Sequence, residues 1–198
     1  MTYFISIQSL CGADGEAAGS MLINHFVEHP NSNAILIPQI KVKSFCELNK
    51  AIELINSSFD SDNNVVICID AHSCESYLTF KDSRSVNKED FVEYCEWKKI
   101  DEVIERLYPI FQKNVLVIFV SCQSASYFVS SKTSHVSVLA SEEEVNAWRA
   151  KELLTVFYDV YSKSNDIEKA YNEMIKIYPL EEEMQTTSNF KAVLKLFT

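Results

Sequence analysis

The chain has 198 residues, of which 47% are hydrophobic, and its 28 acidic and 18 basic residues give a formal net charge of −10 at pH 7. A chain of this size and hydrophobicity can bury one sizeable core, which excludes a disordered or fibrous protein. The negative charge would repel phosphate backbones and anionic bilayers, so neither nucleic acid nor a membrane surface is an expected partner.

Predicted strands and helices alternate from the start of the chain. The hydrophobic periodicity predicts, in order, a strand over 3–8, a helix over 14–29, a strand over 34–40 and a helix over 44–55. The stretch Ser44–Glu47 has the spacing of a capping box, in which a serine hydroxyl and a glutamate three residues later satisfy free backbone N–H groups. Residues 57–64 are polar and are expected to form a loop.

Two strands in the middle of the chain are the most hydrophobic. Val65–Ile69 and Val115–Val120 are continuously apolar, which is typical of strands buried on both faces, so we expect them at the centre of the sheet. Between them the pattern predicts a hairpin over 77–86, followed by an acidic helix whose apolar face includes Ile100 and Phe111.

The last third of the chain continues the alternation. It predicts a strand over 136–139, a helix opened by a second capping box at Ser141–Glu144, a helix over 165–178 and an edge strand over 190–197. Successive β-α-β units predict an α/β fold, a three-layer α-β-α sandwich around a mostly parallel central sheet of about six strands. We expect residues 1–198 to form a single domain.

The N-terminal stretch, the cysteines and the glycines indicate where the protein is located and whether it binds a cofactor. The longest apolar run is six residues, against about 20 for a bilayer span, and the N-terminal stretch has no basic leader, so we expect a cytoplasmic protein. The six cysteines include no CxxC pair and are expected to stay free thiols. The three glycines match neither a P-loop nor a dinucleotide-binding pattern, so no cofactor is expected.

Polar residues follow the two central strands. The first strand is followed by Asp70, Ala71, His72 and Ser73, and the second by Ser121 and Cys122. In parallel α/β sheets the working residues lie beyond the carboxyl ends of the strands, and neighbouring strands are about 4.8 Å apart. If these strands are neighbours, His72 and Cys122 meet. The imidazole can then take the thiol proton or stabilise the thiolate, which attacks a carbonyl carbon.

Several stretches resemble one protein family in their order and spacing. They are 9–17, Ile69–His72, Val120–Ala125, 136–140 and 145–150, with Phe157–Tyr158 and Ala170–Tyr171 downstream. Together they resemble the caspase-like cysteine peptidases, and among these the CHAT type of bacterial effector systems. The resemblance implies a caspase-like fold and an endopeptidase that cleaves protein or peptide substrates. It implies Cys122 as nucleophile, His72 as general base and acid, and the backbone N–H groups of Ser73 and Cys122 as the oxyanion hole.

The sequence also departs from the family pattern. Ser73 stands where the family has glycine, and its N–H remains a donor if the backbone can adopt the required conformation. Val120 stands where relatives carry aspartate or glutamine, so the side-chain preference at the cut is open. Only 12 residues separate Cys122 from His135, without an aspartate, which leaves no counterpart of a processed linker. We therefore expect control by an activating or sensor partner, with an antiphage effector as one possibility.

The roles of the neighbouring residues stay open at this stage. Asp70 could orient the imidazole or be a solvated turn acid, and we favour the turn acid. Val120 and Ser121 are further candidates for orienting the dyad or contacting substrate. The run Glu142–Glu144 could form a pocket for a basic side chain, although acids at a capped helix start explain it as well.

Two other functions compete with the peptidase. The chain could be a silent caspase-like binding or regulatory module, with an acidic surface and aromatic side chains such as Tyr94 and Trp97 serving a partner. Alternatively, four side chains could bind zinc, although their spacing is not that of a zinc finger: Cys68, His72, Cys74 and Cys122.

Overall fold

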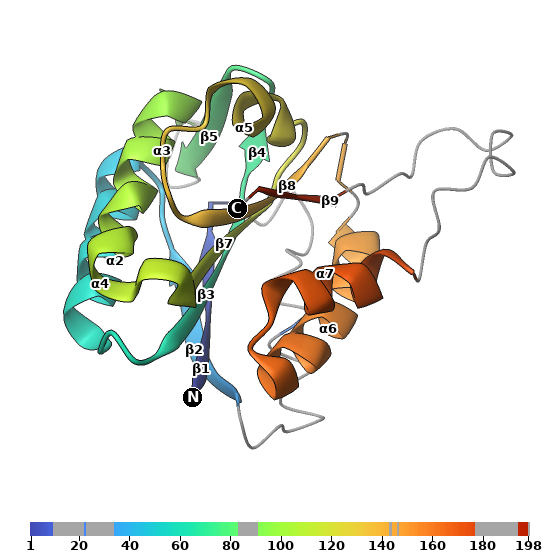
Figure 1. The fold of residues 1–198 in the computed structure, drawn as a ribbon. Helices are drawn as coiled ribbons and strands as arrows, with labels where there is room; N and C mark the ends of the chain where they lie inside the picture. Colours follow the sequence, from blue (N-terminus) through green and yellow to red (C-terminus); the bar gives the residue numbers. More distant parts are fainter. Residues whose placement is uncertain are drawn as a thin grey trace, which may run out of the picture.

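A computed structural model describes residues 1–9, 22, 34–82, 91–142, 144–145, 147–176 and 194–197 (Figure 1). The predicted helix over 14–29 lies outside these residues except for Leu22, which is helical and buried. Of the family-like stretch 9–17, only Ser9 is described.

A six-stranded sheet forms the centre of the fold. Its strands, in spatial order, are β2 (Ala34–Lys41), β1 (Thr2–Gln8), β3 (Asn64–Asp70), β7 (Val115–Val120), β8 (Ser137–Ser141) and β9 (Leu194–Phe197). The strands from β2 to β8 run parallel, and β9 pairs antiparallel with β8 at the edge. This confirms the predicted sheet, with the two most hydrophobic strands, β3 and β7, at its centre.

The outer strand β2 is irregular. It contains Pro38, which has no backbone N–H to donate to a neighbouring strand. The register between β1 and β2 shifts between Ile5 and Ile7, so Ile5 pairs with Ile37 and Ile7 pairs with Ile40. Proline within a sheet is found at edges and bulges, and β2 is both an edge strand and an irregular one.

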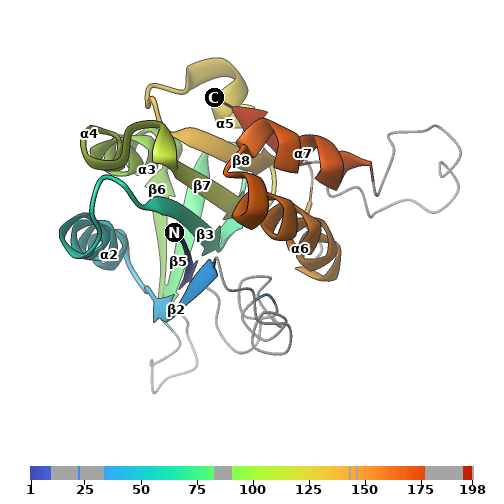
Figure 2. The same cartoon turned by 60° about the horizontal axis from the view of Figure 1, so that its bottom comes forward.

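Helices cover both faces of the sheet (Figures 1 and 2). One face packs against α2 (Phe45–Ser58), α3 (Trp97–Ile104), η1 (Glu105–Leu107), α4 (Tyr108–Phe111) and α5 (Ala125–Ser131). The other packs against α6 (Ala147–Ser164) and α7 (Ile167–Ile175). A short η2 (Gln112–Asn114) leads into β7. Successive side chains of β7 alternate between the two cores, with Val117 in the first and Ile118 in the second, which explains why the whole strand is apolar.

A small antiparallel sheet adjoins the first face. It contains β4 (His72–Ser73), β5 (Tyr77–Asp82) and β6 (Phe91–Glu96) in that order. The hairpin predicted over 77–86 is therefore present, but its second strand lies further along the chain, at β6. The two-residue strand β4 was not predicted, because so short a segment has no periodicity of its own.

One predicted capping box forms and the other does not. The Ser44 hydroxyl accepts a hydrogen bond from the Glu47 N–H at 3.2 Å and caps α2, as predicted. The second box was wrong, because Ser141 is the last residue of β8 and α6 begins only at Ala147. Ser141 is fully buried, and its N–H donates to the Ser124 hydroxyl at 3.0 Å, so it completes the strand.

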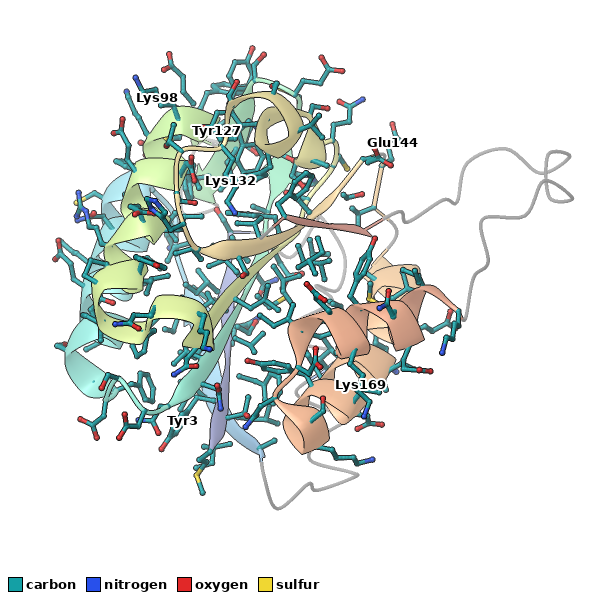
Figure 3. The ribbon with its side chains drawn as sticks, viewed as in Figure 1. Tyr3, Lys98, Tyr127, Lys132, Glu144 and Lys169 are labelled. Carbon is teal, nitrogen blue, oxygen red and sulfur yellow. The ribbon has the colours of Figure 1, made fainter. Side chains whose placement is uncertain are left out.

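A buried carboxylate holds the connection between α5 and β8. Asp101 of α3 is fully buried. Its Oδ2 accepts hydrogen bonds from Tyr127 Oη at 3.1 Å, Thr133 N at 2.6 Å, Thr133 Oγ1 at 2.7 Å and Ser134 N at 3.3 Å. Burial and the nearby Asp101 raise the pKa of Tyr127 to about 12, so the phenol keeps the proton that it donates. In Figure 3, Tyr127 and Lys132 lie on the α3 side of the sheet, away from Lys169 of α7.

Replacing Asp101 with alanine is expected to lower the free energy of unfolding by about 3 kcal/mol, because the N–H of the buried Ser134, the N–H of Thr133 and two hydroxyl groups all lose their acceptor. Urea denaturation measures the change. The matched control is Glu102→Ala on the same helix, where an exposed carboxylate is removed and the change should stay within about 0.5 kcal/mol. Equal losses in the two variants would contradict the anchoring role of Asp101.

Candidate functional site

The carboxyl ends of β3 and β7 lie side by side. The two strands pair in parallel, and Asp70 is the register partner of Val120. The chain positions two residues beyond these partners are 72 and 122. The adjacency that the sequence predicted for the central strands is therefore confirmed, and it brings the segments that carry His72 and Cys122 to the same edge of the sheet.

A direct contact joins these two segments. The Ser73 hydroxyl donates a hydrogen bond to the carbonyl oxygen of Cys122. His72, the residue before Ser73, is half-buried, and its carbonyl accepts a hydrogen bond from the Thr79 hydroxyl at 3.0 Å. The pairing of β4 with β5 thus fixes the backbone of His72 and Ser73 next to the turn that contains Cys122.

The turn after β7 has an unusual backbone. Cys122 is half-buried, and its sulfur accepts a hydrogen bond from the Val145 N–H at 3.5 Å. Gln123 has φ +55°, in the left-handed region that few residues other than glycine adopt. The chain turns sharply at this point and continues into α5, where the Ser126 N–H donates to the Gln123 carbonyl at 3.3 Å.

Trp97 anchors the segment that follows His72 and Ser73. Its indole N–H donates to the carbonyl of Cys74 at 2.9 Å, and the Cys74 N–H donates to the carbonyl of Tyr77 at 3.0 Å. Trp97 is 1% exposed and belongs to the first core, so the proposal that it serves a partner from the surface was wrong. Tyr94, by contrast, is 65% exposed and packs edge-on against Tyr77.

The candidate residues next to His72 and Cys122 are all buried. Asp70 has no exposed surface, so the interpretation as a solvated turn acid was wrong, because β3 continues through this residue and its carbonyl accepts a hydrogen bond from Ser9 N at 2.8 Å. The Cys68 thiol lies 4.0 Å from Asp70 Oδ2. Val120 and Ser121 are also buried, and Val120 packs in the core beneath α6 and α7.

The described cysteines fall into two groups. All five are free, as predicted, while Cys11 lies outside the described residues. Burial and the nearby Asp70 raise the pKa of the Cys68 thiol, and burial raises the pKa of Cys95 to about 11, so both stay protonated and unreactive at neutral pH. Among the described cysteines, the thiols that reagents can reach are those of Cys46, Cys74 and Cys122.

The structure does not assemble the alternative zinc site. Among the described residues, no group of three or more histidine, cysteine or acidic side chains is arranged to hold a metal ion. Cys68 lies in the core on the α6 side of the sheet, hydrogen-bonded to Tyr158, because it belongs to the strand itself. Cys68 therefore cannot join His72, Cys74 and Cys122 as a zinc ligand.

The acidic run after β8 is not a helix start. Glu142 is half-buried and Glu144 is exposed at the end of β8 (Figure 3), while Glu143 lies outside the described residues. The explanation of these acids as a capped first turn was wrong, since α6 begins at Ala147. Val145, directly after this run, is the residue whose N–H contacts the Cys122 sulfur.

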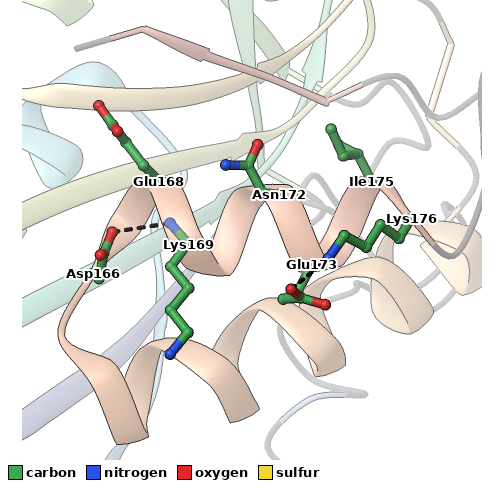
Figure 4. Close-up of a pocket in the computed structure, with 7 residues that line it drawn as sticks. All are labelled: Asp166, Glu168, Lys169, Asn172, Glu173, Ile175 and Lys176. Atoms are coloured by element: carbon green, nitrogen blue, oxygen red, sulfur yellow. Dashed lines mark hydrogen bonds and ion pairs between the residues drawn. The ribbon is translucent and has the colours of Figure 1, made fainter.

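A shallow hollow of about 790 Å³ lies along α7, away from the edge described above (Figure 4). Its lining residues carry both signs of charge: Asp166, Glu168, Lys169, Asn172, Glu173, Ile175 and Lys176. Glu173 and Lys176 are paired at 2.6 Å, and the Lys169 N–H is capped by Asp166 at 2.9 Å. The hollow contains neither His72 nor Cys122, and three of its charged side chains, Asp166, Glu173 and Lys176, serve to cap or brace the helix.

Sequence reasoning missed three parts of this site. Gln123 and Ser124 follow Cys122 in the chain and Val145 contacts its sulfur; all three fall in the family-like stretches Val120–Ala125 and 145–150, but the sequence pattern assigned none of them a role. A positive φ at glutamine has no sequence signal, and Val145 acts through its backbone. Serine two residues after the cysteine is the single side chain that a reader could have marked.

Known proteins support the fold. No family model matches the chain, and no curated protein matches it. Among solved structures, it is similar to a secreted C11 cysteine protease from Bacteroides thetaiotaomicron, solved in complex with an irreversible peptide inhibitor, with a TM-score of 0.52 and 11% identity. The match covers 86% of this chain and 57% of that one, so the chain spans little more than half of that protein's length. The likeness confirms the predicted caspase-like α/β fold.

None of the helices that the structure describes is both long enough and apolar enough to cross a bilayer.

Proposed function

We propose that this protein is a cysteine endopeptidase in which Cys122 is the nucleophile and His72 the general base and acid. His72 takes the thiol proton, and the sulfur attacks the carbonyl carbon of the scissile peptide bond. The tetrahedral intermediate collapses, the C–N bond breaks, and His72 gives the proton to the leaving amine. Water, deprotonated by His72, then hydrolyses the thioester and returns the thiol.

One observation carries this proposal. The parallel pairing of β3 and β7 and the hydrogen bond from Ser73 to the Cys122 carbonyl bring the His72 and Cys122 segments into contact at the carboxyl edge of the sheet. This edge is where α/β folds place their reactive groups. The similarity of the fold to that of a cysteine protease supports the same reading.

The oxyanion hole is assigned to the N–H groups of Ser73 and Cys122. Glycine would be required at position 73 only if φ were positive there. Within the described parts of the chain, the non-glycine residues with positive φ are Gln112, Gln123 and Asn165. Ser73 is not among them, so a serine fits this backbone without strain, and its N–H is kept as a donor.

Control by a partner protein completes the proposal. The connection between α5 and β8 is short and is held by Asp101, and the His135 backbone and ring are held by Glu105 at 2.6 and 2.8 Å. A segment held in this way offers no loose linker for processing. We propose a single CHAT-type domain that acts in the cytoplasm as an effector, such as an antiphage effector, once a sensor protein binds. Peptide-library cleavage with and without candidate sensor proteins tests this.

A silent binding module is the second candidate. The observation in its favour is that two contacts already occupy the groups around the nucleophile, the Ser73 hydroxyl on the Cys122 carbonyl and the Val145 N–H on the sulfur. In such a module the exposed ring of Tyr94 would contact a partner.

Selective alkylation tests the peptidase. Cys46 is exposed on α2, whereas Cys122 is half-buried, so access alone predicts that iodoacetamide modifies Cys46 first. An imidazole that activates the thiol reverses the order, and we expect Cys122 to react about tenfold faster than Cys46. Mass spectrometry of the peptides gives both rates in one sample, and His72→Ala should remove the advantage. A rate at Cys122 below that of Cys46 would count against the dyad.

A further inference from the structure

The fully buried hydroxyl of Ser124 connects the ends of the neighbouring strands β7 and β8. It donates to the carbonyl of Ser121, directly after β7, at 3.0 Å. It also accepts a hydrogen bond from the N–H of Ser141, the last residue of β8, at 3.0 Å. Ser124 precedes α5, so one side chain links β7, β8 and the helix that follows the Cys122 turn.

This turn contains a residue in an unfavourable conformation. Gln123, between Cys122 and Ser124, has φ +55°, which a non-glycine residue keeps only where its surroundings hold it. The Ser124 hydroxyl forms hydrogen bonds with Ser121, which precedes the turn, and with Ser141, at the end of the neighbouring strand β8. Without the hydroxyl, the turn would lose the bond that closes it over Gln123.

The hydrogen bond between Ser124 and Ser141 also bears on the contact with the Cys122 sulfur. Ser141 ends β8, and four residues later the Val145 N–H donates to Cys122 Sγ at 3.5 Å. Contacts therefore close a ring from Cys122 through Ser124 and Ser141 to Val145 and back to the sulfur. The Ser124 hydroxyl is the single side-chain link in this ring, because the other contacts use backbone groups or the sulfur itself.

We infer that Ser124 is a positioning residue, whose hydroxyl sets the place of the Cys122 sulfur relative to His72 by holding the turn against β8. The inference rests on the proposed peptidase function for its consequence in catalysis. The hydroxyl itself touches neither substrate nor reacting atoms, so its effect passes through the backbone of the turn.

The test compares Ser124→Ala with the natural protein. Because small displacements of a reacting group carry large rate penalties, we expect alkylation of Cys122 by iodoacetamide to slow about tenfold. Ser124→Thr keeps the hydroxyl and should stay within about threefold of the natural rate. The matched control is Ser130→Ala on α5, which removes an exposed hydroxyl bonded to the Ser126 carbonyl at 3.1 Å and should leave the rate unchanged.

A spectroscopic readout follows the bond itself. Hydrogen exchange of the Ser141 amide, measured by NMR, should speed up in Ser124→Ala and stay slow in Ser124→Thr. If the alanine variant does not fold, Ser124→Cys provides a weaker hydrogen-bonding group of similar size. Tandem mass spectrometry then distinguishes alkylation at position 122 from alkylation at position 124. An alkylation rate in the folded variant within twofold of the natural one would overturn the inference.

The two proposals fail separately. The ratio of Cys122 to Cys46 alkylation in the natural protein tests the dyad, whereas the ratio of Cys122 alkylation between Ser124→Ala and the natural protein tests the positioning role. If alkylation of Cys122 is slow in the natural protein and is unaffected by His72→Ala, the peptidase is rejected. If Ser124→Ala slows this alkylation further, the link from Ser124 to the Cys122 turn is kept.

Discussion

Replacing Cys122 with alanine is expected to lower the rate of peptide hydrolysis by about 10⁴-fold or more, because removal of a nucleophile leaves only the residual effects of binding and the oxyanion hole. The fold should survive, since Cys122 is half-buried and its side chain is small. Cleavage is measured with a peptide library and then with the best substrate, and the melting temperature confirms that the variant is folded.

Cys46→Ala is the matched control for this substitution. Cys46 lies exposed on α2, on a helix that contributes no residue to the candidate site, and its loss should leave hydrolysis within about twofold. Equal activity of Cys122→Ala and the natural protein would reject the nucleophile. If the Cys122→Ala, His72→Ala double variant also kept full activity in the cell, the silent binding module would be the better account.

Replacing Trp97 with alanine is expected to lower the free energy of unfolding by about 3–5 kcal/mol, the usual cost of removing a large aromatic side chain from a core. Its ring packs against Phe119, Tyr127 and Phe128 at centroid distances of 5.2, 6.5 and 5.7 Å. The indole N–H also satisfies the Cys74 carbonyl, which the substitution would leave without its donor. Urea denaturation at fixed temperature gives the difference.

The chain provides its own control for this experiment, because it has two tryptophans. Trp148 at the start of α6 is 61% exposed and lies 5.6 Å from the Lys151 ammonium. Its replacement should cost no more than about 1 kcal/mol, the value of an exposed cation–π contact. A similar loss from both substitutions would show that Trp97 does not support the β4–β5 turn as the packing implies.

The sheet could be predicted from the sequence because its central strands are apolar on both faces. Val65–Ile69 and Val115–Val120 have no polar side, so they could lie only between two helical layers. Once these strands were taken as neighbours, the order of the chain placed His72 and Cys122 at one edge. The Ser44 capping box was also correct, because it depends on residues three positions apart and on nothing distant.

Other parts depended on contacts that sequence patterns do not show. The Ser141–Glu144 stretch has the form of a capping box, but pairing with Leu194 of β9 and the hydrogen bond to Ser124 kept Ser141 in a strand. The helix α5 was missed because its seven residues include three serines and a β-branched valine, with little helix propensity. Asp70 was expected in solvent because a carboxylate after a strand usually is, whereas here the strand itself includes it.

The two outer strands determine how the sheet ends. On one side, β2 contains Pro38 and an irregular register with β1, and on the other, β9 has four described residues. Among the residues that the structure describes, neither strand presents a long, regular row of unpaired N–H and C=O groups to a strand from another molecule. Sheet edges of this kind disfavour the stacking of sheets from different molecules into aggregates.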